Sequence, residues 1–308
     1  MAQIQDLASG RRRVGVFGRQ RARLLPSWLA AALAACLSPA LALRTAEAPP
    51  PTKPRAFEAF SAYVRATDER NSSELERGRD LLWIDALPEA ARNRAYKSLA
   101  AGEAQIEPRR TLSGGREIPC PDGMIHHWEG LIFVAGAHID DVLKILEDYD
   151  HHSTYYAPDV TRSKLEERDG DHFRAFLRFR RQRFITVVLN TEHDVRYYRD
   201  SAKQAHSRSS ATHIAEVDNP DKPTEREKPR EADSGFLWGM ETWWRLEEKD
   251  GGVYLQSEVV SLTRDIPTGL AWMIGPFITS IPRDTLNFTL EATRKAVLAQ
   301  ARGRQQQR

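Results

Sequence analysis

Residues 235–262 read GFLWGMETWWRLEEKDGGVYLQSEVVSL, two runs rich in apolar and aromatic residues that Lys249-Asp250-Gly251-Gly252 join. An Asp-Gly connection between two such runs is a strong signal for a β-hairpin with a tight turn. The chain continues through Ile266-Pro267-Thr268-Gly269 into residues 283–299, where Leu286, Leu290, Thr293 and Val297 recur at helical spacing. A sheet that ends by laying one long helix across its face encloses a hollow, and most hollows of this kind hold an apolar ligand. The stretch therefore predicts a ligand-binding container.

Outward from this stretch, residues 114–300 read as one domain of strands with two short helices near its start. Residues 137–149 place their apolar side chains on one helical stripe, and residues 150–157 form a second short helix that ends at Pro158. Residues 219–233 are highly charged and predict a solvated loop. Runs of strand-forming residues predict strands at 117–119, 124–134, 160–168, 172–181, 184–198, 204–217, 235–248 and 253–262.

This order of elements resembles the START-like (helix-grip, SRPBCC-type) superfamily, which includes lipid-transfer domains, polyketide cyclase/dehydrase-like proteins and plant pathogenesis-related allergens. The resemblance covers residues 115–299. It rests on the element order, on the paired helices of residues 137–157 after the first strand, and on Pro282-Arg283 where the last helix starts. It implies an α+β helix-grip fold, a curved antiparallel β-sheet wrapped around a long C-terminal helix, with an N-terminal helical segment. It also implies a hydrophobic ligand such as a lipid, an isoprenoid or a polyketide.

Residues 1–48 have the organisation of an export signal. Six arginines between positions 11 and 23 precede an apolar run over residues 24–37, which is too short to span a bilayer comfortably. Ala40-Leu41-Ala42 offers a cleavage site, whereas Leu33-Ala34-Ala35-Cys36 matches a lipobox, in which Cys36 carries lipid. We expect an exported protein, periplasmic or lipid-anchored to the cell envelope, with both processing routes open. An uncleaved membrane anchor is the alternative.

Composition sets further limits. Residues 49–113 combine a Pro-rich tether with a helical segment, and residues 301–308 predict a disordered tail. A net charge of +2, with 41% hydrophobic and 29% charged residues, is ordinary for a soluble domain and gives no electrostatic case for nucleic acid as a partner. Because no metal-ligand spacing or cofactor fingerprint occurs, we expect neither a metal nor a cofactor. If Cys36 is removed or lipidated, Cys120 is alone and an intramolecular disulfide is excluded.

The strand over residues 184–198 is unusually polar. Its alternation places Asn190, Glu192, Asp194 and Arg196 on one face, and Thr191, His193, Val195 and Tyr197 on the other. One interpretation is that these polar groups orient a ligand in the hollow. The other is that the first set forms a solvent-facing side, paired with neighbours such as Arg174, Arg178 and Arg180.

We expect ligand contacts from side chains on the elements that border the hollow: Trp128, Tyr155, Tyr156, Asn190, Glu192, Arg208, Trp238, Trp243, Trp272 and Phe277. The predicted function is binding or transfer of a hydrophobic molecule without catalysis. One alternative is a cyclase/dehydrase-like enzyme in which His193, Glu192 or Arg208 acts as acid, base or oxyanion group. Another is a module that binds an envelope protein. The apolar residues 270–278 would then be its patch, although a gate, membrane contact or simple burial fits them too.

Overall fold

The computed structural model describes residues 53–78, 81–182, 186–265 and 271–306, without the side chains of residues 271–280 and 304–306. The predicted export signal, Cys36 and the proline run of the tether lie outside the described residues. Trp272 and Phe277 fall in the part of the last helix for which only the backbone is described.

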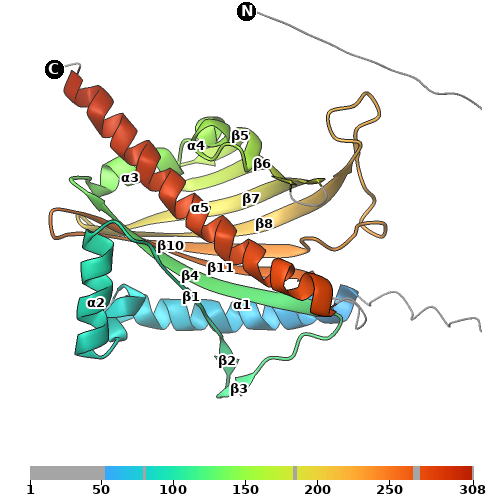
Figure 1. Ribbon diagram of the computed structural model, residues 1–308, viewed down its shortest axis with the longest axis horizontal. Helices are drawn as coiled ribbons and strands as arrows, with labels where there is room; N and C mark the ends of the chain where they lie inside the picture. The colour runs from blue at the N-terminus through green and yellow to red at the C-terminus, as the bar shows by residue number, and fades with distance from the viewer. Residues whose placement is uncertain (1–52, 79–80, 183–185, 266–270, 307–308) are drawn as a thin grey trace, which may run out of the picture. The chain divides into compact units, whose positions relative to one another are not determined.

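Helices lie at the two ends of the chain and after the first long strand, as Figure 1 shows. They are α1 (Lys53–Glu76), α2 (Glu89–Ala100), α3 (Ile139–Leu146), α4 (His152–Tyr155) and α5 (Ala271–Gln306), with short 3-10 helices η1 (Trp83–Ala86) and η2 (Tyr149–His151). The strands are β1 (Gln105–Pro108), β2 (Leu112–Ser113), β3 (Arg116–Glu117), β4 (Gly123–Ala135), β5 (Val160–Asp169), β6 (His172–Gln182), β7 (Thr186–Ser201), β8 (Gln204–Asp218), β9 (Arg226–Glu227), β10 (Gly239–Lys249) and β11 (Gly252–Arg264).

Nine strands form one antiparallel sheet in the order β1-β4-β11-β10-β8-β7-β6-β5, with β9 paired to β8, while β2 and β3 make a separate hairpin. The long helix α5 crosses one face of this curved sheet (Figure 1). The arrangement is the α+β helix-grip fold predicted from the order of elements.

The hairpin that opened the sequence analysis joins β10 to β11. Lys249 pairs with Gly252, so the turn consists of Asp250 and Gly251. Both residues have positive φ, 56° and 74°. A two-residue turn of this type requires positive φ at both positions, which Gly adopts freely and Asp tolerates. The predicted hairpin is confirmed.

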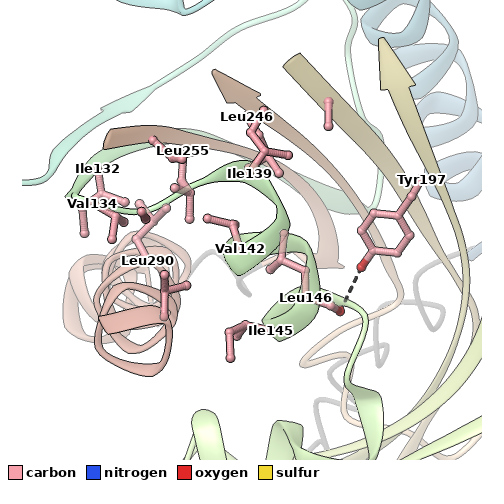
Figure 2. Packing of buried hydrophobic residues seen from close by; sticks show 14 of the residues in the cluster. Ile132, Val134, Ile139, Val142, Ile145, Leu146, Tyr197, Leu246, Leu255 and Leu290 are labelled. Carbon is pink, nitrogen blue, oxygen red and sulfur yellow. Dashed lines mark hydrogen bonds between the residues drawn. The ribbon is translucent and has the colours of Figure 1, made fainter. Parts of the chain in front are cut away.

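We call the face of the sheet that packs against α3 and α5 the inner face. A large apolar cluster lies there, and Figure 2 shows its packing around Ile132, Val134, Val142, Leu146, Leu246, Leu255 and Leu290. At Gly130 of β4, an added Cβ would lie 2.6 Å from the Cδ1 atom of Leu290. The absence of a side chain at Gly130 therefore lets α5 rest directly on the sheet. The hydroxyl of Tyr197 donates to the carbonyl of Leu146 at 2.9 Å, which ties β7 to the end of α3.

We call the opposite face of the sheet the outer face, and the N-terminal helices cover part of it. Phe60, Tyr63 and Val64 of α1 pack with Val260 and Leu262 of β11. Further along the sheet, a second cluster joins η1 and α2 to β4 and β11 through Leu82, Ile84, Leu99, Leu131 and Tyr254. The helical segment predicted as an appendage thus packs on the sheet.

Three predicted boundaries are wrong. The sheet begins before residue 114, because β1 pairs with β4 from Gln105. The closing helix starts at Ala271 rather than at Arg283, and it continues to Gln306, past the end predicted at Ala299. The helix runs through Pro276 and Pro282, whereas we placed its start after Pro282 because proline is disfavoured in helix interiors. The charged segment 219–233 also contains the short strand β9.

Candidate functional site

Two cross-strand rows of side chains on the inner face define the candidate site. The first row runs through Tyr197, Ser207, Trp244, Ser257 and Gly130, and the second through Val195, Ser209, Thr242, Val259 and Trp128. Side chains paired across an antiparallel sheet point to the same face, and Gly130 and Tyr197 fix that face as the inner one. The first row thus places Trp244 between two serine hydroxyls, and the second row combines the hydroxyls of Ser209 and Thr242 with Val259 and Trp128.

Four side chains in these rows are more exposed than those in the next row toward α3. That row contains Ala205, Leu246, Leu255 and Ile132, none of them more than 1% exposed. By contrast, Trp128, Thr242, Trp244 and Val259 are each only partly buried. The inner face therefore changes from a closed apolar core to a partly open surface lined by aromatic rings and hydroxyls.

His193 adds a polar group beside the second row. We define the polar stripe as Thr191, His193, Ser207, Ser209, Thr242 and Ser257. The Thr191 hydroxyl donates to the carbonyl of Leu177 at 3.1 Å, so it accepts a hydrogen bond from Nε2 of His193 at 2.8 Å. This assignment leaves Nδ1 of His193 as an acceptor, which the hydroxyl of Ser209 approaches at 3.4 Å. Burial, with the nearby charge of His152, lowers the pKa of His193 to about 4. The ring is neutral at pH 7.

The predicted ligand contacts separate into two groups. Trp128 lies in the second row, and Tyr156 lies in the core, with its hydroxyl 3.1 Å from that of Thr293 on α5. Tyr155 is half-buried and donates to Asp148 at 2.6 Å.

The remaining predicted contacts with described side chains do not join the two rows. Asn190, Glu192 and Arg208 alternate with inner-face residues and so point to the outer face. Asn190 accepts a hydrogen bond from Arg178 at 2.8 Å, the pairing that the second interpretation named, but both side chains are buried rather than solvent-facing. Trp238 and Trp243 pack against α1. Of His193, Glu192 and Arg208, the residues named for a cyclase-like enzyme, only His193 points inward.

The sequence analysis missed the most informative members of the site, Ser207, Ser257, Thr242 and Trp244. A signal was present, because Ser207 and Ser209 alternate along one strand as Thr191 and His193 do along its neighbour. The alternation marks two residues as sharing a face. It does not say which face is the inner one.

A second cluster, which we call the outer charged cluster, lies between α1 and the outer face. Glu129 of β4 and Glu258 of β11 stand directly opposite each other, and both are 2% exposed. Arg70 and Asn71 of α1 bind Glu258, the latter at 2.9 Å. His127 donates to Glu258 from Nε2 at 2.5 Å.

Further bonds complete this cluster. Arg109 pairs with Glu129 at 2.9 Å, and the amide of Gln256 donates to the same carboxylate at 2.7 Å. Arg245 binds Asn71 and pairs with Glu74 at 2.6 Å. Since its centre is enclosed beneath α1, the cluster acts as the polar attachment of this helix to the sheet.

The outer charged cluster predicts a pH dependence of stability. Burial and the charge of Glu258 raise the pKa of Glu129. A carboxyl whose folded pKa is raised contributes stability that is full below its unfolded pKa and is lost as the pH rises through its folded pKa. The Glu129→Gln variant has no titrating group at this position, whereas the wild type loses this contribution as the pH rises. We therefore expect the free energy of unfolding of the variant, minus that of the wild type, to increase as the pH rises from 4.5 to 8. Urea unfolding across this range measures the difference. A flat or falling difference contradicts the assignment, and Glu117→Gln, on the exposed hairpin, is the control.

Of two pockets, one lies on the outer face and the other borders the β1 end of the first row, where Ile106 pairs with Gly130. One of about 150 Å³ on the outer face is lined by Phe57, Phe60 and Trp238 together with Lys53 and Arg230. The other, of about 390 Å³, lies between the edge strand β1 and α5 and is lined by Gln105, Ile106, Glu107, Arg283, Asp284 and other residues. No helix among the described residues has both the length and the apolar character needed to cross a membrane. The same residues contain no group of three His, Cys, Asp or Glu side chains that could hold a metal ion.

The chain has a START-like helix-grip fold, as the order of its elements predicted. No family model matches the chain, and a search of curated proteins found no match. Solved structures with a similar fold include a STAR-related lipid transfer protein from Xanthomonas axonopodis, which is 16% identical, with a TM-score of 0.41 over 62% of this chain and 98% of that one. Human STARD10 is 11% identical, with a TM-score of 0.42 over 71% and 84%. The Zhui aromatase/cyclase from Streptomyces is 14% identical, with a TM-score of 0.37 over 59% and 96%. At these identities the likeness concerns the fold alone.

Proposed function

We propose that this protein binds a hydrophobic small molecule, such as a lipid, an isoprenoid or a polyketide-like compound, on the inner face of its sheet beside α5. The observation that carries the proposal is the greater exposure of aromatic side chains in the two rows than in the neighbouring row of the inner face. A closed row of aliphatic residues gives way to rows in which two tryptophan rings stay partly exposed. Partly exposed apolar side chains that face a covering helix are stabilised when a ligand removes them from water, by about 25 cal/mol per Å².

We propose binding or transfer without catalysis. A general acid or base works best with a pKa near the operating pH. The pKa values of His193 and of His152 are both lowered to about 4 by burial, so each is neutral and weakly basic at pH 7. His152 is also held by the carbonyls of Ile145 and Leu146, both at 3.2 Å from its Nε2. Neither histidine is therefore poised for proton transfer.

The proposed place of action is the cell envelope. Support comes from the sequence of residues 1–48, with its basic start, apolar run and two processing sites. The mass of the mature chain discriminates between the two routes, since cleavage after Ala42 removes Cys36 whereas the lipobox route retains it with a lipid.

The proposal is tested by native mass spectrometry of the full chain, expressed with its own leader in a bacterial host and purified without detergent exchange. We expect a discrete apolar adduct that solvent extraction releases. In Thr242→Phe a phenyl ring occupies the middle of the second row, so we expect the bound fraction to fall at least tenfold, although such overpacking also costs about 1–3 kcal/mol of stability.

The matched control is Arg196→Phe, which introduces the same ring on an exposed outer-face position of β7. It should keep the adduct. A wild-type chain that stays free of adducts after incubation with mixed lipids contradicts the proposed function. Equal occupancy in wild type and Thr242→Phe shows that the ligand lies elsewhere.

A further inference from the structure

We infer that the ligand is an uncharged, largely apolar molecule with a hydroxyl or carbonyl group, and that the hydroxyl of Ser207 or of Ser257 binds this group. The inference deepens the proposed function and rests on it. It concerns the class of ligand and the side chains that select it.

The hydroxyls of Ser207 and Ser257 carry the inference. Ser207 is 2% exposed and Ser257 is 1% exposed, yet among the residues that the structure describes neither hydroxyl has a hydrogen-bond partner. Leaving a buried polar group unsatisfied costs about 1–3 kcal/mol, so such groups normally have a partner, either protein, water or ligand. Two orphan hydroxyls in one row therefore indicate a partner that enters the inner face.

The position of these hydroxyls fits an oriented ligand. Both flank Trp244 in the first row, Ser207 on β8 and Ser257 on β11. With strands spaced by about 4.8 Å, the two side chains stand roughly 10 Å apart across the tryptophan ring. A single ligand group therefore reaches one of the two hydroxyls, and a serine hydroxyl can donate to it or accept from it.

The surroundings select against a charged ligand. None of the ten residues named in the two rows is Asp, Glu, Lys or Arg, and Arg168, which the second row reaches beyond Val195 and Phe173, pairs with Glu147 at 3.1 Å. Arg181, on the inner side of β6, is held by Asp159 at 2.8 Å and by Thr285 at 2.6 Å. A phosphate or carboxylate placed on these rows would be desolvated without a cation from the rows to pair with it, which is strongly unfavourable.

The test compares three compounds of one skeleton: farnesol with a hydroxyl, farnesene without one, and farnesyl phosphate with an anion. Binding to the full chain is measured by calorimetry and by quenching of tryptophan fluorescence. We expect farnesol to bind best. One of the two variants Ser207→Ala and Ser257→Ala should weaken farnesol binding by about 2- to 10-fold, the value of one neutral hydrogen bond, and both should leave farnesene binding unchanged. Ser210→Ala is the control, because Ser210 lies on the same strand but bonds to Glu241 on the outer face.

The outcomes separate this inference from the proposed function. If farnesyl phosphate binds best, the ligand is anionic and the inference is wrong. If farnesol and farnesene bind equally, or if both serine variants keep full farnesol affinity, the hydroxyls hold water rather than ligand and only the inference fails. If none of the three compounds binds, the proposed function fails with it.

Discussion

Replacing Glu258 by alanine is expected to lower the free energy of unfolding by about 3–5 kcal/mol, because removing one partner of a buried ion pair leaves the others uncompensated. In this chain the substitution leaves three side chains without their carboxylate partner, because Arg70, Asn71 and His127 all bind Glu258 beneath α1. Although burial alone would raise it, the hydrogen bond from His127 and the charge of Arg70 lower the pKa of Glu258. The carboxylate is therefore ionised and bound in the folded state. Urea unfolding at pH 7 measures the change.

The control for this prediction is an exposed ion pair. Glu117 pairs with Arg110 at 2.6 Å, but their side chains are 71% and 79% exposed. Exposed pairs contribute about 0–1 kcal/mol, so Glu117→Ala should change stability little. Glu258→Gln, which keeps an amide oxygen for Asn71, should lie between the two. If Glu258→Ala unfolds at the same urea concentration as Glu117→Ala, the outer charged cluster does not attach α1.

Local sequence signals were sufficient for much of the fold. The turn at Asp250 and Gly251 needs positive φ at two adjacent positions, a requirement that few residue pairs meet, so the hairpin was predictable. The alternation in β7 correctly separated Thr191 and His193 from Asn190 and Glu192, because side-chain direction in a strand has a strict period of two. The order of such elements then led to the fold class.

The candidate site was less predictable because both faces of the central strands are covered. Trp243 and Trp244 show the difficulty. Trp243 packs against α1 and donates to Asp68 at 2.9 Å, while its neighbour Trp244 faces the inner surface. When one face of a sheet is exposed to solvent, polar side chains mark that face and apolar side chains mark the core face. Here α1 brings its own apolar residues and a buried charged cluster to the outer face, so polarity along β10 and β11 no longer distinguishes the faces.

Leu290→Ala is expected to destabilise the protein by about 3–5 kcal/mol and to weaken ligand binding at the same time. Leu290 has no exposed surface and rests on Gly130, a member of the first row. Truncating a buried leucine removes transfer free energy and leaves a cavity, and the cost rises when the surroundings cannot collapse. Gly130 has no side chain that could move into the space. Denaturant unfolding and farnesol binding, both at pH 7, measure the two effects.

Leu298→Ala provides the matched control, since Leu298 lies two turns later on the same helix and is only partly buried. We expect a smaller loss of stability there, about 1 kcal/mol, and unchanged ligand binding. If Leu290→Ala loses both stability and ligand binding and Leu298→Ala does not, the contact of α5 with Gly130 also maintains the geometry of the ligand-binding surface. If Leu290→Ala lost stability but bound farnesol as the wild type does, the two rows would keep their geometry without that contact, and α5 would serve only to cover them.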